Sequence, residues 1–293
     1  MTLVVGFHAT KNDIAGLALG ARLARSAGQD LRVVTVIPAP WPTPVALHAD
    51  RAYADWADER GKDAIDRAQQ LLAKHCPDMS ATVDWVAGRS VPGALIDEAE
   101  RIGASMIVAG PGPSGAYGRI NVHSTAETLL HSSPVPVALA TRGYRFRDHD
   151  RVGRVTLAFR GDDMSRRILA DTARLCTEVH AALRVVTFAV GGKVMYPPAV
   201  GFHAEDDVTD TWVRHSEAEQ KTALDELTVR PDSLECVVAQ GSNWAEAVDA
   251  LPWGDDDVLV VGSSQTRGLS RLFLGSTATK IARNSPVPVI VVP

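Results

Sequence analysis

The sequence predicts an α/β protein made of two copies of a doubly wound, five-stranded parallel-sheet domain. Short segments recur at one offset of 152 residues: LRVVT at 31–35 returns at 183–187, and SPVPV at 133–137 returns at 285–289. Strand-like and helix-like patterns alternate within each copy. The 293 residues suffice for two domains, each with its own core. A repeat of this length indicates a duplicated domain rather than a solenoid unit.

Valine-rich runs bounded by glycine, proline or aspartate predict the buried strands of each copy. In the first copy these runs are 2–8, 31–37, 81–87, 105–109 and 135–140. In the second copy they are 154–160, 183–189, 234–239, 257–261 and 287–292.

Apolar residues at helical spacing predict the helices between the strands. Ile14, Leu17 and Ala21 fall on one face of the first helix, and Gly28 is its expected stop. A third helix is expected after a loop over 88–92. The remaining patterns cover 65–72, 95–102 and the start at Ser124 in the first copy, and 168–176, 224–227 and the start at Ser276 in the second.

Strands separated by single helices require right-handed crossovers, which give a parallel sheet with helices on both faces. The predicted domains are 1–143 and 152–293, joined by an arginine-containing linker over 142–151. Pro286 and Pro288 remove two amide donors from the same side of the last predicted strand. Such a strand belongs at a sheet edge, where it either blocks pairing or meets its duplicate in an intramolecular pseudo-dimer.

Composition narrows the class of protein. The net charge of −5 gives no bulk electrostatic reason to expect nucleic acid or an anionic membrane as a partner. No apolar run reaches the length of a membrane span, and the N-terminus lacks the basic region of a signal peptide. Three scattered cysteines suggest a reducing compartment and no metal cluster. We therefore expect a cytoplasmic protein without a metal site.

The loop after the fourth strand carries the most informative chemistry, because doubly wound sheets bind ligands outside the carboxyl ends of their strands. In the second copy, Gly262 and Ser263 follow the strand, and Gly275, Ser276 and Thr277 open a helix. A helix N-terminus with free amides and a hydroxyl is a ready anion site, to which Arg267 and Arg271 would add positive charge. The alternative is a glycine-rich turn followed by an ordinary helix cap.

Together, the order of elements, the copy length, the SPVPV segment and this loop resemble the universal stress protein family (UspA-like) in its tandem form. The resemblance covers nearly the whole chain. It implies a Rossmann-like domain of the adenine nucleotide alpha hydrolase-like type and, in members that bind ATP, Gly-x-x-Gly, nine residues, then Gly-Ser or Gly-Thr. It implies that the first glycine contacts ribose and the last pair binds phosphates, while an aspartate ending strand one holds the adenosine end.

The second copy matches this pattern only in part. Gly262, Gly275 and Ser276 agree with it, but Gln265 replaces the second glycine and Arg160 replaces the aspartate. Arg160 reverses a charge where the resemblance implies adenosine recognition. Phe188 stands where it implies a smaller residue near the adenine.

The first copy departs further from the pattern. Gly110 and Ser124 survive, while Pro113, His123 and His8 occupy the second-glycine, third-glycine and aspartate positions. We therefore expect no ATP in the first copy. His8 and His123 either meet another ligand, form a proton-sensitive pair, or simply fill a vacated nucleotide pocket.

Other catalytic patterns are absent from the sequence. The GxGxxG match at 110–115 follows the fourth strand rather than the first and contains two prolines, so it predicts a loop. No GxxxxGK[ST], GxSxG or HExxH segment occurs. No nucleophile with an aligned general base can be identified, so we assign no catalytic residue.

These observations lead to one principal hypothesis and two alternatives. The principal hypothesis is a non-enzymatic stress-response regulator with degenerate nucleotide sites, its second domain retaining part of the ATP-binding loop. The alternatives are an ATP-binding protein with slow ATPase activity in the second domain, and an interaction scaffold without a ligand. An adenine nucleotide is the expected small-molecule partner, and association of the chain into a homodimer is left open.

Overall fold

The computed structural model describes residues 1–8, 14–40, 48–147, 151–191, 203–263 and 274–293, with the backbone alone for 48–50 and 203–210. Contacts within the chain divide it into two units. Most of the first unit is Met1–Arg151, and the second consists of Val152–Gly262 and Gly275–Val292. The predicted domain limits of 1–143 and 152–293 stay a prediction.

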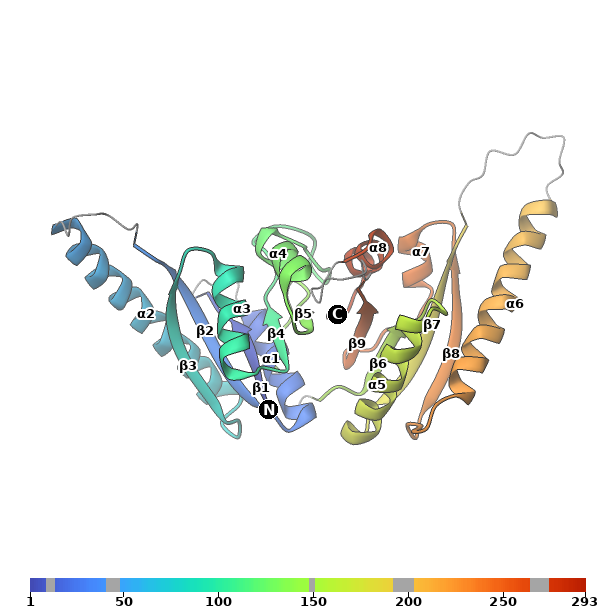
Figure 1. The fold of residues 1–293 in the computed structure, drawn as a ribbon, viewed down its shortest axis with the longest axis horizontal. Helices are drawn as coiled ribbons and strands as arrows, with labels where there is room; N and C mark the ends of the chain where they lie inside the picture. The colour runs from blue at the N-terminus through green and yellow to red at the C-terminus, as the bar shows by residue number, and fades with distance from the viewer. Residues whose placement is uncertain (9–13, 41–47, 148–150, 192–202, 264–273) are drawn as a thin grey trace. The chain divides into compact units, whose positions relative to one another are not determined.

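In its described residues, the first unit is a five-stranded parallel sheet with four helices (Figure 1). Its strand order is β3-β2-β1-β4-β5, and every pairing is parallel. In chain order the elements are β1 (Thr2–Gly6), α1 (Ile14–Ala27), β2 (Asp30–Pro38), α2 (His48–His75), β3 (Ala81–Gly88), α3 (Val91–Ile102), β4 (Met106–Ala109), α4 (Ser124–Ser132) and β5 (Val137–Leu139).

The second unit repeats this arrangement, with the strand order β10-β9-β6-β7-β8 and parallel pairing throughout. In chain order the elements are β6 (Arg154–Ala158), α5 (Asp163–Val179), β7 (Ala182–Val190), α6 (His203–Asp225), β8 (Leu234–Gly241), α7 (Trp244–Asp249), β9 (Asp257–Gly262), α8 (Ser276–Asn284) and β10 (Val289–Val292). The predicted fold class is therefore confirmed in both copies.

The chain reverses its direction of travel across the first sheet between β1 and β4. From β1 it moves outward through β2 to β3, and after α3 it returns to β4 on the other side of β1. Right-handed crossovers in opposite directions place α1 and α2 on one face and α3 and α4 on the other, in agreement with the contact between α3 and α4. The carboxyl ends of β1 and β4 are thus the expected position of a ligand site.

The SPVPV segments form turns that lead into the last strands, so the prediction that their prolines lie within those strands is wrong. The hydroxyl of Ser133 accepts a hydrogen bond from the backbone N–H of Val135 at 3.2 Å, and the carbonyl of Pro136 accepts one from Ile107 at 2.9 Å. β5 begins only at Val137. The second copy repeats both bonds, from Val287 to Ser285 at 3.3 Å and from Leu259 to Pro288 at 2.9 Å.

Two predicted boundaries near helices also differ from the structure. The loop expected over 88–92 ends at Ser90, whose side chain accepts a hydrogen bond from the backbone N–H of Gly93 and caps α3. Pro92 is therefore in the first helical turn, where its missing N–H costs no bond. Leu227 lies beyond the end of α6 at Asp225.

The predicted linker packs on the first unit over its described residues 142–147. The guanidinium carbon of Arg142 lies 4.5 Å from the centre of the Tyr117 ring, and Phe146 stacks on His75 with 4.6 Å between ring centres. Tyr144 lies beneath Arg22 of α1 at 5.5 Å. Tyr144 and Phe146 therefore attach this segment to the first unit, although its composition predicted a polar linker.

The first helix of each copy ends in a left-handed residue. Gly28 follows α1 with φ of 60°, which confirms the predicted stop. The corresponding residue after α5, 152 positions later, is His180 with φ of 56°. The N–H of His180 bonds the carbonyls of Cys176 and Thr177, so the turn has the same function in both copies.

The second unit contains a largely buried charged cluster near the amino ends of β6, β7 and β9. Arg184 of β7 is fully buried, and its Nε donates to the hydroxyl of Thr156 at 3.0 Å. Its guanidinium carbon lies 4.7 Å from the centre of the Trp253 ring, and its Nη2 is 3.5 Å from Oδ2 of Asp257. Asp257, 1% exposed, also accepts from Nε and Nη2 of Arg154 at 3.0 and 2.7 Å. Burial and the neighbouring Arg154 lower the pKa of Arg184.

Candidate functional site

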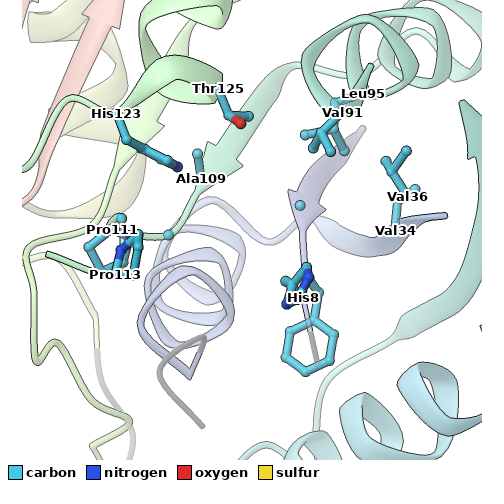
Figure 2. A pocket seen from close by; sticks show the side chains of 14 residues that line it. His8, Val34, Val36, Val91, Leu95, Ala109, Pro111, Pro113, His123 and Thr125 are labelled. Carbon is cyan, nitrogen blue, oxygen red and sulfur yellow. The ribbon is translucent and has the colours of Figure 1, made fainter. Parts of the chain in front are cut away.

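A cavity of about 360 Å³ opens at the carboxyl ends of β1 and β4 in the first unit (Figure 2). It lies at the reversal point of the strand order, where the topology predicts a ligand site. Three segments contribute to it: Gly6–His8 at the end of β1, Gly110–Pro113 after β4, and the start of α4. Of the residues that the sequence singled out, His8, Gly110, Pro113 and His123 line the cavity, whereas Ser124 does not.

The remaining wall is apolar and comes from β2 and α3. Val34 and Val36 line the cavity from β2, and Val91 and Leu95 line it from α3 (Figure 2). The loop pattern did not indicate these residues. The repeat could have identified Val36, because it occupies the position that Phe188, one of the predicted site residues, holds 152 residues later.

Close backbone packing holds the loop after β4 against α1. A Cβ atom at Gly16 of α1 would lie 2.8 Å from the backbone nitrogen of Gly110. Only glycine at position 16 permits this approach. Within the loop, a Cβ atom at Gly112 would lie 3.1 Å from Cβ of His123. The loop after β4 therefore packs closely against α1 at Gly110 and against His123 at Gly112.

His123 is the N-cap residue of α4, but its side chain makes no capping hydrogen bond. Its Nδ1 atom is buried without a hydrogen-bond partner among the described residues. Burial lowers the pKa of His123, and the backbone of Asn121 offsets this only in part. Burial therefore favours the neutral form of this imidazole.

His8 and His123 both line the cavity but do not form a pair. His8 is exposed at the end of β1, and Figure 2 shows its ring well apart from that of His123. The expectation that the fold brings both residues to the first-copy cleft is thus met. The expectation of a proton-sensitive pair finds no support in this separation.

Ser124 and Thr125 begin α4, and the cavity is lined by Thr125 rather than by the predicted Ser124. Ser124 is exposed, and its carbonyl accepts a hydrogen bond from the hydroxyl of Thr128. Thr125, which the sequence did not single out, lines the cavity beside His123 (Figure 2). The lining contains no lysine, arginine, aspartate or glutamate among the described residues.

The corresponding segments of the second unit are described in part. Gly262 ends β9, Ser263 after it is buried, and Gly275 is the N-cap of α8 without a side-chain capping bond. Ser276 and Thr277 follow as exposed residues of the first turn. The predicted loop residues Gln265, Arg267 and Arg271 lie outside the described residues.

Arg160 and Phe188 occupy the predicted adenosine end of the second unit. The guanidinium of Arg160 is ion-paired with Asp162, with Nε 2.7 Å from Oδ2, and Asp162 caps α5 through Ser165. Burial raises the pKa of Asp162, but the N–H of Ser165 and the charge of Arg160 outweigh it and lower the pKa overall. Phe188 is 7% exposed within β7. Arg160 is therefore paired within its own chain, although 66% of its side chain is exposed.

Two doubly wound α/β domains in tandem, each with a loop and a helix N-terminus at its reversal point, define a Rossmann-like protein of duplicated architecture. A sequence model of the Universal stress protein family matches residues 1–141 and 152–293. Universal stress proteins of Mycobacterium tuberculosis (strain H37Rv) and Mycobacterium bovis are each 38% identical to this chain over 296 aligned residues, covering 100% of both sequences. This chain belongs to the universal stress protein family.

A solved structure is similar in fold over nearly the whole chain. The crystal structure of a universal stress protein from Archaeoglobus fulgidus covers 99% of this chain and 95% of its own, with a TM-score of 0.60 and 18% identity. In the described parts of this chain, no helix is both long and apolar enough to cross a membrane.

Proposed function

We propose that this chain is a non-enzymatic, cytoplasmic regulator in the stress response, with degenerate nucleotide sites. The observation that carries the proposal is the replacement of phosphate-binding groups in the first-unit cavity. Pro113 offers no backbone donor, and His123 places a neutral ring where the family pattern has glycine. A triphosphate entering this cavity would lose hydration without gaining a countercharge from the described lining residues.

ATP therefore does not fit the first unit. The second unit fits its phosphates better, because Gly275 and Ser276 leave the N-terminal amides of α8 without a side-chain cap. It fits the adenosine end poorly. Arg160 stands in place of an acid and is ion-paired with Asp162, and Phe188 is larger than its counterpart Val36. We infer weak nucleotide binding in the second unit and none in the first.

Isothermal titration calorimetry of the full chain with ATP and Mg²⁺ tests this proposal. We expect weak binding at no more than one site. Gly275→Asp, which places a negative charge at the start of α8, should weaken that binding at least tenfold. Ser90→Asp is the matched control, because it adds the same charge at the start of α3 and keeps an oxygen that can accept the N–H of Gly93. Tight binding of two nucleotides per chain would overturn the proposal.

Slow ATP hydrolysis in the second unit is the alternative that the same protein preparation can test. No described residue near Gly275 combines a nucleophile with an aligned base, so we expect release of phosphate from ATP to equal that of a protein-free control. Hydrolysis that Gly275→Asp abolishes would establish the alternative. Absence of any ligand in both units would favour the interaction scaffold.

A further inference from the structure

The second sheet ends in a long edge strand without the usual protection. β8 (orange in Figure 1) is the last strand of the order β10-β9-β6-β7-β8 and has eight residues, Leu234–Gly241. Natural proteins protect such an edge with lysine, proline, a bulge or a short strand, because its free backbone groups can pair with another chain. β8 contains neither lysine nor proline, and its register with β7 runs without a bulge from end to end.

The backbone groups of β8 alternate between those that face β7 and those that face outward. The carbonyl of Ser233 accepts a hydrogen bond from Leu183 at 2.9 Å, and that of Gly241 accepts one from Gly191 at 3.0 Å. Odd-numbered residues of β8 therefore face β7, and even-numbered residues face outward. The outward residues are Leu234, Cys236, Val238 and Gln240. Within the described part of the chain, their backbone groups have no hydrogen-bond partner.

The first sheet protects the corresponding edge strand, β3. The carbonyls of Ser80 and Gly88 face β2, so Trp85 is an outward residue of β3. The N–H of Trp85 donates to Oδ1 of the preceding Asp84 at 2.8 Å and is thus occupied within its own strand. β8 follows β3 at an offset of 153 residues, which places Val237 at the position of Asp84. The second copy therefore lacks the carboxylate that occupies this edge in the first.

We propose that β8 pairs antiparallel with β8 of a second copy of this chain, across a two-fold axis at Val237. In this register Leu234 lies opposite Gln240 of the other copy, and Cys236 lies opposite Val238. All four outward residues are then in hydrogen-bonded pairs, each of which exchanges two N–H···O bonds. The same strand serves on both sides, as a two-fold interface requires.

The side chains of β8 fit this register. Glu235 is the charged residue of the strand and lies opposite Ala239 of the other copy, so no like charges meet. An axis at Val238 would place Leu234 opposite Ser242, whose N–H already donates to Glu246 at 3.0 Å. The axis at Val237 thus satisfies more of the outward groups.

A matched pair of proline variants tests the proposal on the full chain. Gln240→Pro removes an outward N–H of an exposed residue and leaves the bonds to β7 in place. Ala87→Pro is the control, because Ala87 is the exposed, outward residue at the same position of β3. In sedimentation velocity over a concentration series, we expect the native chain to form a reversible dimer. Gln240→Pro should raise the dissociation constant of this dimer at least tenfold, whereas Ala87→Pro should leave it unchanged.

Cross-linking of the native chain provides a second measurement that needs no proline. Cys236 is exposed, whereas Cys76 and Cys176 are buried, so a short bismaleimide should react at Cys236. In the proposed register the Cys236 residues of the two copies are diagonal neighbours on one face, with Cβ atoms about 7–8 Å apart. We expect a covalent dimer. The double variant Cys236→Ser, Ala87→Cys carries its exposed thiol on β3 and should stay monomeric under the same treatment.

Each outcome decides for or against the pairing of β8. A native chain that sediments as a monomer at every concentration overturns the proposal, as does a dimer that Gln240→Pro leaves intact. Equal weakening by the two proline variants also overturns it, because the loss would then not be specific to β8. A dimer that cross-links through Cys236 and is lost in Gln240→Pro alone supports it. These measurements contain no nucleotide, so they are independent of the test of the proposed function.

Discussion

Removing the carboxylate of Asp257 should destabilise the second unit far more than removing the carboxylate of the preceding residue, Asp256. Asp257→Ala leaves Arg154 and the fully buried Arg184 without the acid that lies 2.7 and 3.5 Å from their Nη2 atoms. It also removes the acceptor of the Gly254 N–H, which is 2.9 Å from Oδ2. Breaking a buried ion pair from one side costs about 3–5 kcal/mol. Glu235, 3.8 Å from Arg184 and 4.0 Å from Arg154, is half exposed and compensates the remaining charge only in part.

Hydrogen exchange measured by mass spectrometry on the full chain can resolve this loss by region. At 1.4 kcal/mol per tenfold, the expected cost corresponds to exchange faster by about a hundredfold to several thousandfold in strands β6, β7 and β9. Strands β1, β2 and β4 of the first unit serve as the internal reference.

The matched control is Asp256→Ala. Asp256 is the preceding residue, has the same charge and is exposed, so its removal should change stability by less than about 0.5 kcal/mol. If the two variants exchanged at similar rates in β9, the reasoning from the buried cluster would be refuted.

Two further predictions concern an acid-sensitive ion pair and a tight backbone contact. Glu98 is buried between Arg101 and Arg32, and their hydrogen bonds lower its pKa below 4.5 despite its burial. A carboxylate whose pKa is lowered by folding stabilises the protein above its unfolded pKa, and this stabilisation is lost as the pH falls through its folded pKa. The urea midpoint of unfolding should therefore fall less steeply between pH 5 and about 3 in Glu98→Gln than in the native chain. Gly241→Ala should cost about 1–3 kcal/mol in urea unfolding, because its Cβ would lie 2.3 Å from the backbone nitrogen of Ala247, whereas Gly191→Ala, whose Cβ would meet nothing within 4 Å, should be nearly neutral. Equal midpoints for these two glycine variants would contradict the contact.

Elements with a strong local pattern were predictable from the sequence. Strands such as β2 and β7 are valine runs buried on both faces, and their position 152 residues apart gives the same signal twice. The SPVPV segments led to a wrong start for the last strands. Their valines favour a strand, whereas their prolines lack the N–H group that pairs with a neighbouring strand. Only the structure shows that the Ser133 hydroxyl turns the chain before β5 begins.

The candidate site was predictable where it lies in loops and not where it depends on packing. Glycine and histidine positions after β1 and β4 indicated the edge of the first sheet at which the cavity lies. The apolar wall from Val36 and Val91 depends on how β2 and α3 converge, which no single segment encodes. The loop glycines therefore favoured a site in the second copy, whereas the described cavity lies in the first.

The paired helix ends at Gly28 and His180 show what duplication allows. Both residues are left-handed, with φ of 60° and 56°, yet only one has a side chain. A side chain in this conformation costs about 1–2 kcal/mol. A Cβ atom at Gly28 would meet nothing within 4 Å, so steric crowding does not explain the glycine there. The two copies therefore share one backbone conformation at this position. Glycine adopts it without strain in the first copy, whereas His180 adopts it at a cost in the second, where its N–H bonds the last carbonyls of α5.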